Sequence, residues 1–248
     1  MRFLGLPLLA FALNASFARS QSPTDNPYSF LNSVSIAAGY SDNSTHIVLG
    51  RADNRRLAEL DATYSRRIRH TQSFDWYYDL ELRPLTFVQD PVSTTTFIIQ
   101  FTGEPPFGPI TTHSGPIESR CQSATITNPG GTFPGQTVTE TQTCGTRWTY
   151  AGGLSPLGQR INFAPTHRLQ PVAFFNAGFL VSPRDVPVFT SSRFNFTFDF
   201  GAGFQFFQSH RRAWSLDYSI HHLSNAYIGY QNPGVDSQIV RLTYSFPF

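Results

Sequence analysis

The chain has 248 residues, and its 18 Lys+Arg against 16 Asp+Glu leave a formal net charge of +2. This near balance gives no indication of a nucleic-acid partner, and an aromatic content of 15% excludes a disordered chain. Beyond residue 20 there is no apolar run of about 18 residues, which excludes a helical membrane protein. We therefore expect an all-β protein, either soluble or a membrane barrel.

Residues 1–20 have the pattern of a secretory signal peptide. Arg2 precedes an apolar run over residues 3–13, and small residues follow it. We expect cleavage after Ala18 or Ser20, which leaves residues 21–248 as the folded part, in a compartment where disulfides persist. The alternative is a buried first helix, but residues 20–27 are polar, as in an exposed mature terminus.

Strands are predicted wherever apolar and polar residues alternate with period two. In chain order, these segments lie near 33–41, 58–65, 74–83, 146–156, 169–182, 193–206, 214–220 and 240–248. In 193–206 every even position is apolar and every odd one is polar or Gly. Such a length exceeds the ~5–6 residues of a mean soluble strand and fits the ~9–11 residues of a tilted membrane strand.

The lengths of the connections alternate between short and long. The short ones lie near 69–73, 165–168 and 208–211, and the longer ones near 42–53, 88–145, 183–192 and 225–234. Outer-membrane barrels have short periplasmic turns and longer external loops. With an even strand count and the closing Phe248, this predicts an eight-stranded antiparallel transmembrane β-barrel in the outer membrane of a Gram-negative bacterium. A soluble secreted sandwich is the alternative.

The segment 88–145 is expected to be one long external loop. Its Cys121 and Cys144 are predicted to form a disulfide that closes it, worth ~3 kcal/mol in the chain-entropy picture. A metal site would need more ligands than the nearby His113. Because 88–145 is long for a loop, residues 94–101 could instead extend the preceding strand or form an extra hairpin.

A polar pair interrupts the apolar face of the segment 214–220. The next even positions are His222 and Ser224, and Asp236 has the parity of the apolar residues on the last strand. Polar groups on a lipid-facing wall cost free energy unless they pair. A serine, a histidine and a carboxylate are also the parts of a nucleophile, its base and the group that orients the base. The alternative is a set of rim residues above the membrane.

The same segment carries a family resemblance. The run His222-Leu223-Ser224-Asn225-Ala226, followed by Asn232-Pro233-Gly234-Val235-Asp236-Ser237, resembles the H-x-S-N, turn and acid pattern of the lipid A 3-O-deacylase family, also called acyloxyacyl hydrolase-like outer-membrane proteins. Residues 153–158, 170–171 and 193–200 are similar as well, so that the resemblance covers roughly 55–88 and 147–248.

The resemblance implies a hydrolase whose active site faces lipid. Ser224 would be the nucleophile, His222 the general base, Asp236 the orienting acid and Asn225 a group that helps to hold the oxyanion. The substrate would be a 3-O-linked acyl chain of lipid A, with water as acceptor and no metal or cofactor. The sequence departs from the family at the acid, which is Glu in characterised members and is Asp236, one methylene shorter, here.

Other functions remain open at this stage. One is a non-catalytic outer-membrane barrel, an adhesin or envelope-stabilising protein that acts through its loops. Another is an acyltransferase that works from inside the lumen, which would need catalytic residues of inward parity. His221 is the competing base, but its odd parity directs it inward. A homodimer that buries the site is one further alternative.

Overall fold

The computed structural model describes residues 28–248, and the chain is almost entirely β-structure there. The predicted signal peptide, residues 1–20, lies outside the described residues. Within residues 28–248, no helix is long and apolar enough to cross a membrane. The all-β, antiparallel character expected from the alternation is confirmed.

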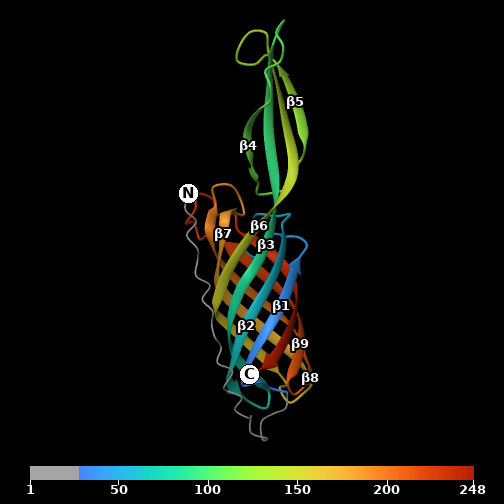
Figure 1. Ribbon diagram of the computed structural model, residues 1–248, viewed down its shortest axis with the longest axis vertical. Coiled ribbons are helices and arrows are strands. Elements are labelled where there is room, and N and C mark those ends of the chain that lie inside the picture. The colour runs from blue at the N-terminus through green and yellow to red at the C-terminus, as the bar shows by residue number, and fades with distance from the viewer. Residues whose placement is uncertain (1–27) are drawn as a thin grey trace, which may run out of the picture.

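Ten strands form one antiparallel sheet (Figure 1). They are β1 (Asn32–Ser41), β2 (Arg56–His70), β3 (Phe74–Phe101), β4 (Ile110–Pro116), β5 (Ala124–Pro129), β6 (Gln136–Phe163), β7 (Leu169–Val186), β8 (Ser192–Ser209), β9 (Arg212–Ser224) and β10 (Val235–Pro247). Seven of the eight predicted strand segments fall within one of the long strands, β1–β3 and β6–β9, and the eighth, 240–248, exceeds β10 by one residue.

These eight strands close into a ring. Their order is β3-β2-β1-β10-β9-β8-β7-β6, and a further pairing of β3 with β6 joins its two ends. At one end of the ring the connections are the short segments 71–73, 164–168 and 210–211. At the other end are the segments 42–55, 187–191 and 225–234, and we call this end the rim. The predicted alternation of short and long connections is therefore present except at 187–191, which has five residues, the same number as 164–168.

The two faces of the ring differ in chemistry, as β9 shows. Trp214, Leu216 and Tyr218 point outward and are 42%, 59% and 49% exposed, whereas Asp217 and Ser219 are buried on the inner face. Large apolar side chains recur at outward positions of the other strands too. Exposed apolar side chains that recur in this way are typical of a surface that contacts another protein or a membrane.

The inner face holds a network of buried charges. Arg83 on β3 donates to Glu81 and Asp199 and lies 3.1 Å from Nδ1 of His221. The guanidinium of Arg241 on β10 donates two hydrogen bonds to the carboxylate of Glu59 on β2. Buried charges are tolerated when they are paired and hydrogen-bonded, as these arginines and their carboxylate partners are.

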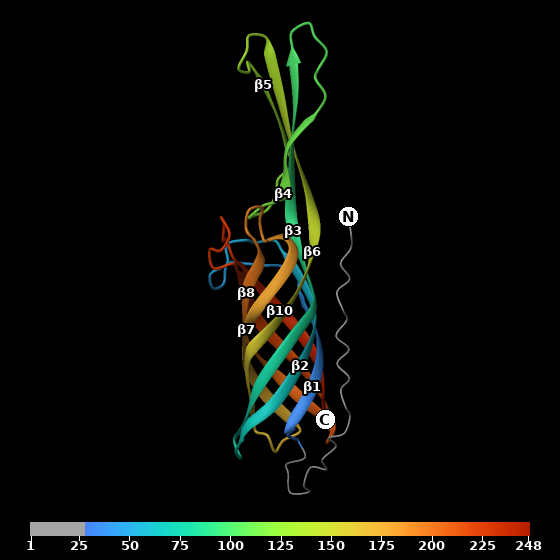
Figure 2. The same cartoon turned by 60° about the vertical axis from the view of Figure 1, so that its left-hand side comes forward.

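Beyond the rim, β3 and β6 continue as a paired ribbon and carry β4 and β5 on their outer edges. Both views show these four strands projecting away from the ring, at the end opposite the C-terminus (Figures 1 and 2). We call this part the extension. The prediction of a loop over 88–145 was therefore wrong, and the alternative that residues 94–101 prolong the strand is confirmed.

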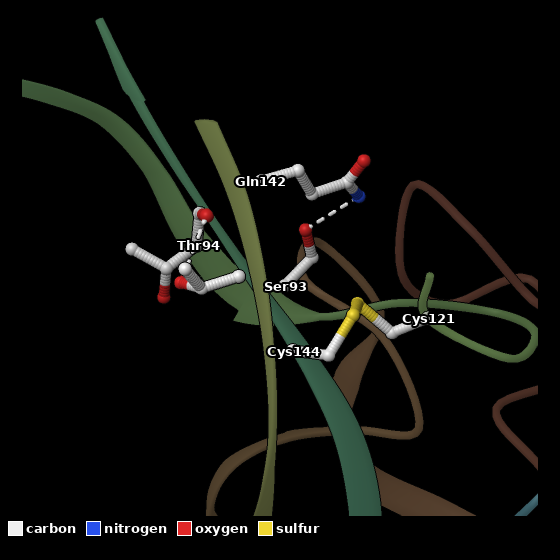
Figure 3. Close-up of a disulfide and its surroundings, with 6 residues drawn as sticks. Ser93, Thr94, Cys121, Gln142 and Cys144 are labelled. Atoms are coloured by element: carbon white, nitrogen blue, oxygen red, sulfur yellow. Dashed lines mark hydrogen bonds between the residues drawn. A yellow bond between two sulfur atoms is a disulfide. The ribbon is translucent and has the colours of Figure 1, made fainter. Parts of the chain in front are cut away.

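The extension forms because its sequence suits a strand ladder. Thr94 lies opposite Thr143, and β-branched residues favour pleated strands. The predicted disulfide is present: Cys121 and Cys144 are bonded, with their Cα atoms 5.6 Å apart, and they tie the segment after β4 to β6. Figure 3 shows this bond near the base of the extension. Its geometry is that of an ordinary disulfide.

Candidate active site

The site lies where β9 ends and β10 begins, at the rim. In the antiparallel register, Asp236 is the direct partner of His222. Nδ1 of His222 is 2.5 Å from Oδ1 of Asp236, and both side chains are buried. Because the two residues lie directly opposite each other, the short side chain of Asp236 is long enough to reach the imidazole.

His222 lies on the outer, apolar face of the ring. Its ring stacks on Phe198 of β8, with centroids 4.6 Å apart, and Phe196 on the same face is the direct partner of Ser224. His221 points the other way, and its Nδ1 is 2.6 Å from Asp199 in the inner charge network. As the alternation predicts, His222 points outward and His221 points inward.

Four backbone amides bind the carboxylate of Asp236. The N–H groups of Ile47, Val48, Leu49 and Gly50 all donate to its Oδ2 atom, at 3.1, 2.5, 3.1 and 3.0 Å. Successive N–H groups that converge in this way form an anion-binding nest. They favour the ionised carboxylate, which leaves Oδ1 as the acceptor for His222.

The segment 42–55, which carries this nest, is fastened to the site by its backbone. Thr45 donates to the carbonyl of Asp236 at 3.0 Å, Arg51 to that of Pro233 at 2.6 Å, and Ala52 to that of Gly234 at 3.0 Å. Sequence reasoning missed this segment because its contribution comes from backbone groups, which have no residue signature.

Arg55 anchors the end of this segment. Its Nε is 3.1 Å from Asp90, and its other nitrogens donate to the carbonyls of Ile117, Glu118 and Pro187, among others. The guanidinium is fully buried. It therefore joins the nest segment, the base of the extension and the 187–191 segment into one unit.

Two glycines allow the segments 42–55 and 225–234 to approach the His222–Asp236 pair closely. A Cβ atom on Gly50 would lie 2.5 Å from the backbone nitrogen of Asp236, far inside ordinary contact distance. Gly234 has φ +63°, and a Cβ there would lie 3.2 Å from Cε1 of His222. Glycine is the residue that accepts both the backbone conformation and the close packing.

Ser224 is half-buried and lies two residues after His222 on the same strand, hence on the same face. Within residues 28–248, neither its hydroxyl nor Nε2 of His222 makes a hydrogen bond. With Nδ1 bound to Asp236, Nε2 is the nitrogen left for the serine. The described part of the chain also contains no group of three His, Cys, Asp or Glu residues suited to a metal ion.

Asn225 is held inside the 225–234 segment. Its Nδ2 donates to Oγ of Ser191 at 3.0 Å and to the carbonyl of Gln231 at 2.8 Å. Its backbone N–H donates to Oδ1 of Asn232 at 3.0 Å. Asn225 therefore shapes the loop after Ser224, and it would have to exchange one of these partners to hold an oxyanion. That role stays a prediction.

Comparison with known proteins gives one family match. Residues 133–245 match the model of the family described as lipid A 3-O-deacylase (PagL). No curated protein matches the chain. The matched stretch contains Ser224, His222 and Asp236 but not the nest segment 42–55. The resemblance seen in the sequence is thus confirmed over residues 133–245, where this chain is similar to the lipid A 3-O-deacylase family.

Proposed function

We propose that this protein is an outer-membrane esterase that removes a 3-O-linked acyl chain from lipid A, with Ser224, His222 and Asp236 as its catalytic residues. The observation that carries the proposal is the buried His222–Asp236 pair on the outer, apolar face, two residues from Ser224. A paired base beside a serine hydroxyl is the arrangement that nucleophilic ester hydrolysis needs.

The setting proposed for this site is a transmembrane β-barrel made by the ring of eight strands. Its outward apolar residues would face hydrocarbon, and its charged interior would be shielded from lipid, as in outer-membrane barrels. Residues 1–20 would direct export, and the extension would project from the outer surface. The site at the rim would then meet the acyl chains of the outer leaflet.

In the proposed reaction, each of the three side chains has one role. His222 Nε2 accepts the Ser224 proton as Oγ forms a bond to the ester carbonyl carbon, and the carbonyl π electrons move to oxygen. When the oxyanion collapses, the bond to the sugar 3-oxygen breaks, and that oxygen takes the proton from His222. Water, deprotonated by His222, then releases the fatty acid and restores Ser224. Asp236 holds the imidazole and stabilises its charge.

The test is the mass of lipid A from cells that express the chain. We expect one ester-linked acyl chain to be lost with the natural sequence and retained with Ser224→Ala. Ser209→Ala, an exposed serine at the opposite end of the ring, is the matched control and should behave as the natural sequence. Heat-modifiable migration on a detergent gel reports in parallel whether each variant forms a barrel.

The rival is a non-catalytic outer-membrane barrel. Unchanged lipid A from cells whose barrel is folded, with purified protein equally inactive on lipid A in detergent, would overturn the esterase proposal. The extension, with its exposed threonines, would then be the part of the molecule to examine for binding.

A further inference from the structure

Three arginines gather at the rim beside the base of the extension. Arg147 of β6, Arg184 of β7 and Arg193 of β8 line a cleft of about 200 Å³, together with Asp185 and apolar side chains. A second cleft of about 410 Å³ continues from it and shares Arg147 and Arg184. The proposed catalytic machinery uses none of these residues.

The cleft has an excess of positive charge. Its lining holds three guanidinium groups and one carboxylate, Asp185, which lies 3.8 Å from Arg193 in an exposed pair. The Nε of Arg147 is buried and has no hydrogen-bond partner within residues 28–248. An unpaired buried donor costs free energy, which an acceptor from a ligand would recover.

The cleft lies further toward the rim than the proposed active site, and its Arg193 is on the opposite face of β8 from Phe196. Arg193 stands three residues before Phe196 on β8, and Phe196 pairs directly with Ser224. At about 3.3 Å per residue, Arg193 is displaced roughly 10 Å toward the rim. The loops between the two places are bonded to each other, since Asn225 donates to Ser191 and the backbone N–H of Gln231 to the carbonyl of Thr190. These hydrogen bonds therefore fix the distance between the cleft and the proposed active site.

We propose that this cleft binds a phosphate group on the headgroup of the lipid substrate. The inference rests on the proposed function, because it assigns the headgroup of the same molecule whose ester lies at Ser224. Arginine binds phosphate through paired, charge-assisted hydrogen bonds. With the acyl chain on the apolar wall, a polar headgroup lies toward the rim, and a phosphate there meets the three guanidinium groups.

Binding is measured first, with Ser224→Ala protein so that no substrate is consumed. The probes are detergent micelles that contain phosphorylated lipid A or lipid A dephosphorylated enzymatically. The variant combines Arg147→Gln, Arg184→Gln and Arg193→Gln. A control combines Arg69→Gln, Arg211→Gln and Arg212→Gln, three exposed arginines at the opposite end of the ring.

We expect the Kd for phosphorylated micelles to rise at least tenfold in the cleft variant and to change less than twofold in the control. The Kd for dephosphorylated micelles should be the same in both. An equal loss with both probes would overturn the proposal. So would inorganic phosphate that binds the cleft as tightly as the lipid, since the site would then serve the free ion.

Turnover distinguishes this inference from the proposed function. In the protein with Ser224, the cleft variant should raise KM for phosphorylated lipid A and leave kcat unchanged. If the cleft variant hydrolyses phosphorylated lipid A with an unchanged KM, the phosphate site is refuted and the proposed esterase function is not. If phosphorylated lipid A binds through the three arginines but the natural sequence does not hydrolyse it, the esterase function is refuted and the phosphate site is not.

Discussion

The nest around Asp236 can be disturbed by a single methyl group. Gly50→Ala would place a Cβ atom 2.5 Å from the nitrogen of Asp236 and 2.8 Å from its carboxylate carbon. Ordinary contact begins near 3.4 Å, so loop and strand must separate by about 0.9 Å. A misplacement of about 1 Å near a catalytic group can cost roughly 10²-fold in rate. We expect kcat to fall by about that factor.

The assay is hydrolysis of lipid A in mixed micelles, with the folded fraction measured by heat-modifiable migration. KM should stay nearly constant, because the nest holds the orienting carboxylate rather than the substrate. The matched control is Gly108→Ala, since a Cβ on Gly108 meets nothing within 4 Å. Its activity should equal that of the natural sequence.

A double-mutant cycle tests the physical reason. If Gly50→Ala acts by displacing the carboxylate, its effect should be much smaller when Asp236→Ala has already removed that group, because residues that act as a unit are not additive. Full activity of folded Gly50→Ala protein would refute the reasoning. An equal loss in both backgrounds would show that the segment 42–55 acts by another route.

Three further predictions concern the base, the interior and the extension. His222→Gln should reduce kcat at least about 10³-fold, whereas His221→Gln should retain activity; the reverse result would assign the base to the inner histidine. Arg83→Gln leaves buried carboxylates uncompensated, so the ring of strands should lose about 3–5 kcal/mol of stability, seen as a lower unfolding temperature on detergent gels. Cys144→Ser removes the disulfide with Cys121, worth ~3 kcal/mol; protease should then cut the extension sooner while hydrolysis of lipid A continues, and unchanged cleavage would contradict this.

The strands could be predicted because their signal is local. In β8 the alternation over residues 193–206 assigns every side chain to a face from the sequence alone. The same parity separates His221 from His222, and the structure places them on opposite faces. The extension was expected only as an alternative, over residues 94–101, because residues 88–145 pair between segments far apart in the chain and their alternation is weak.

The part of the candidate site that could not be predicted is made of backbone. Ile47 to Gly50 contribute N–H groups, which every non-proline residue has, so nothing in their identity marks them as partners of a carboxylate about 190 residues away. For Asn225 the family resemblance implies an oxyanion role, and in the structure its side-chain donors are hydrogen-bonded within the loop. Whether a polar side chain is available depends on neighbours that only the folded chain supplies.

By itself, the sequence determined that the chain is built of long amphipathic strands, that Cys121 can pair with Cys144, and that a histidine and a serine share an apolar face. These features depend on residue type and period, which are local. The tertiary structure decided that Asp236 lies opposite His222 and that β3 pairs with β6. It also decided that backbone amides of the 42–55 segment bind the Asp236 carboxylate. Register and loop docking arise from contacts between distant segments, and no local pattern encodes them.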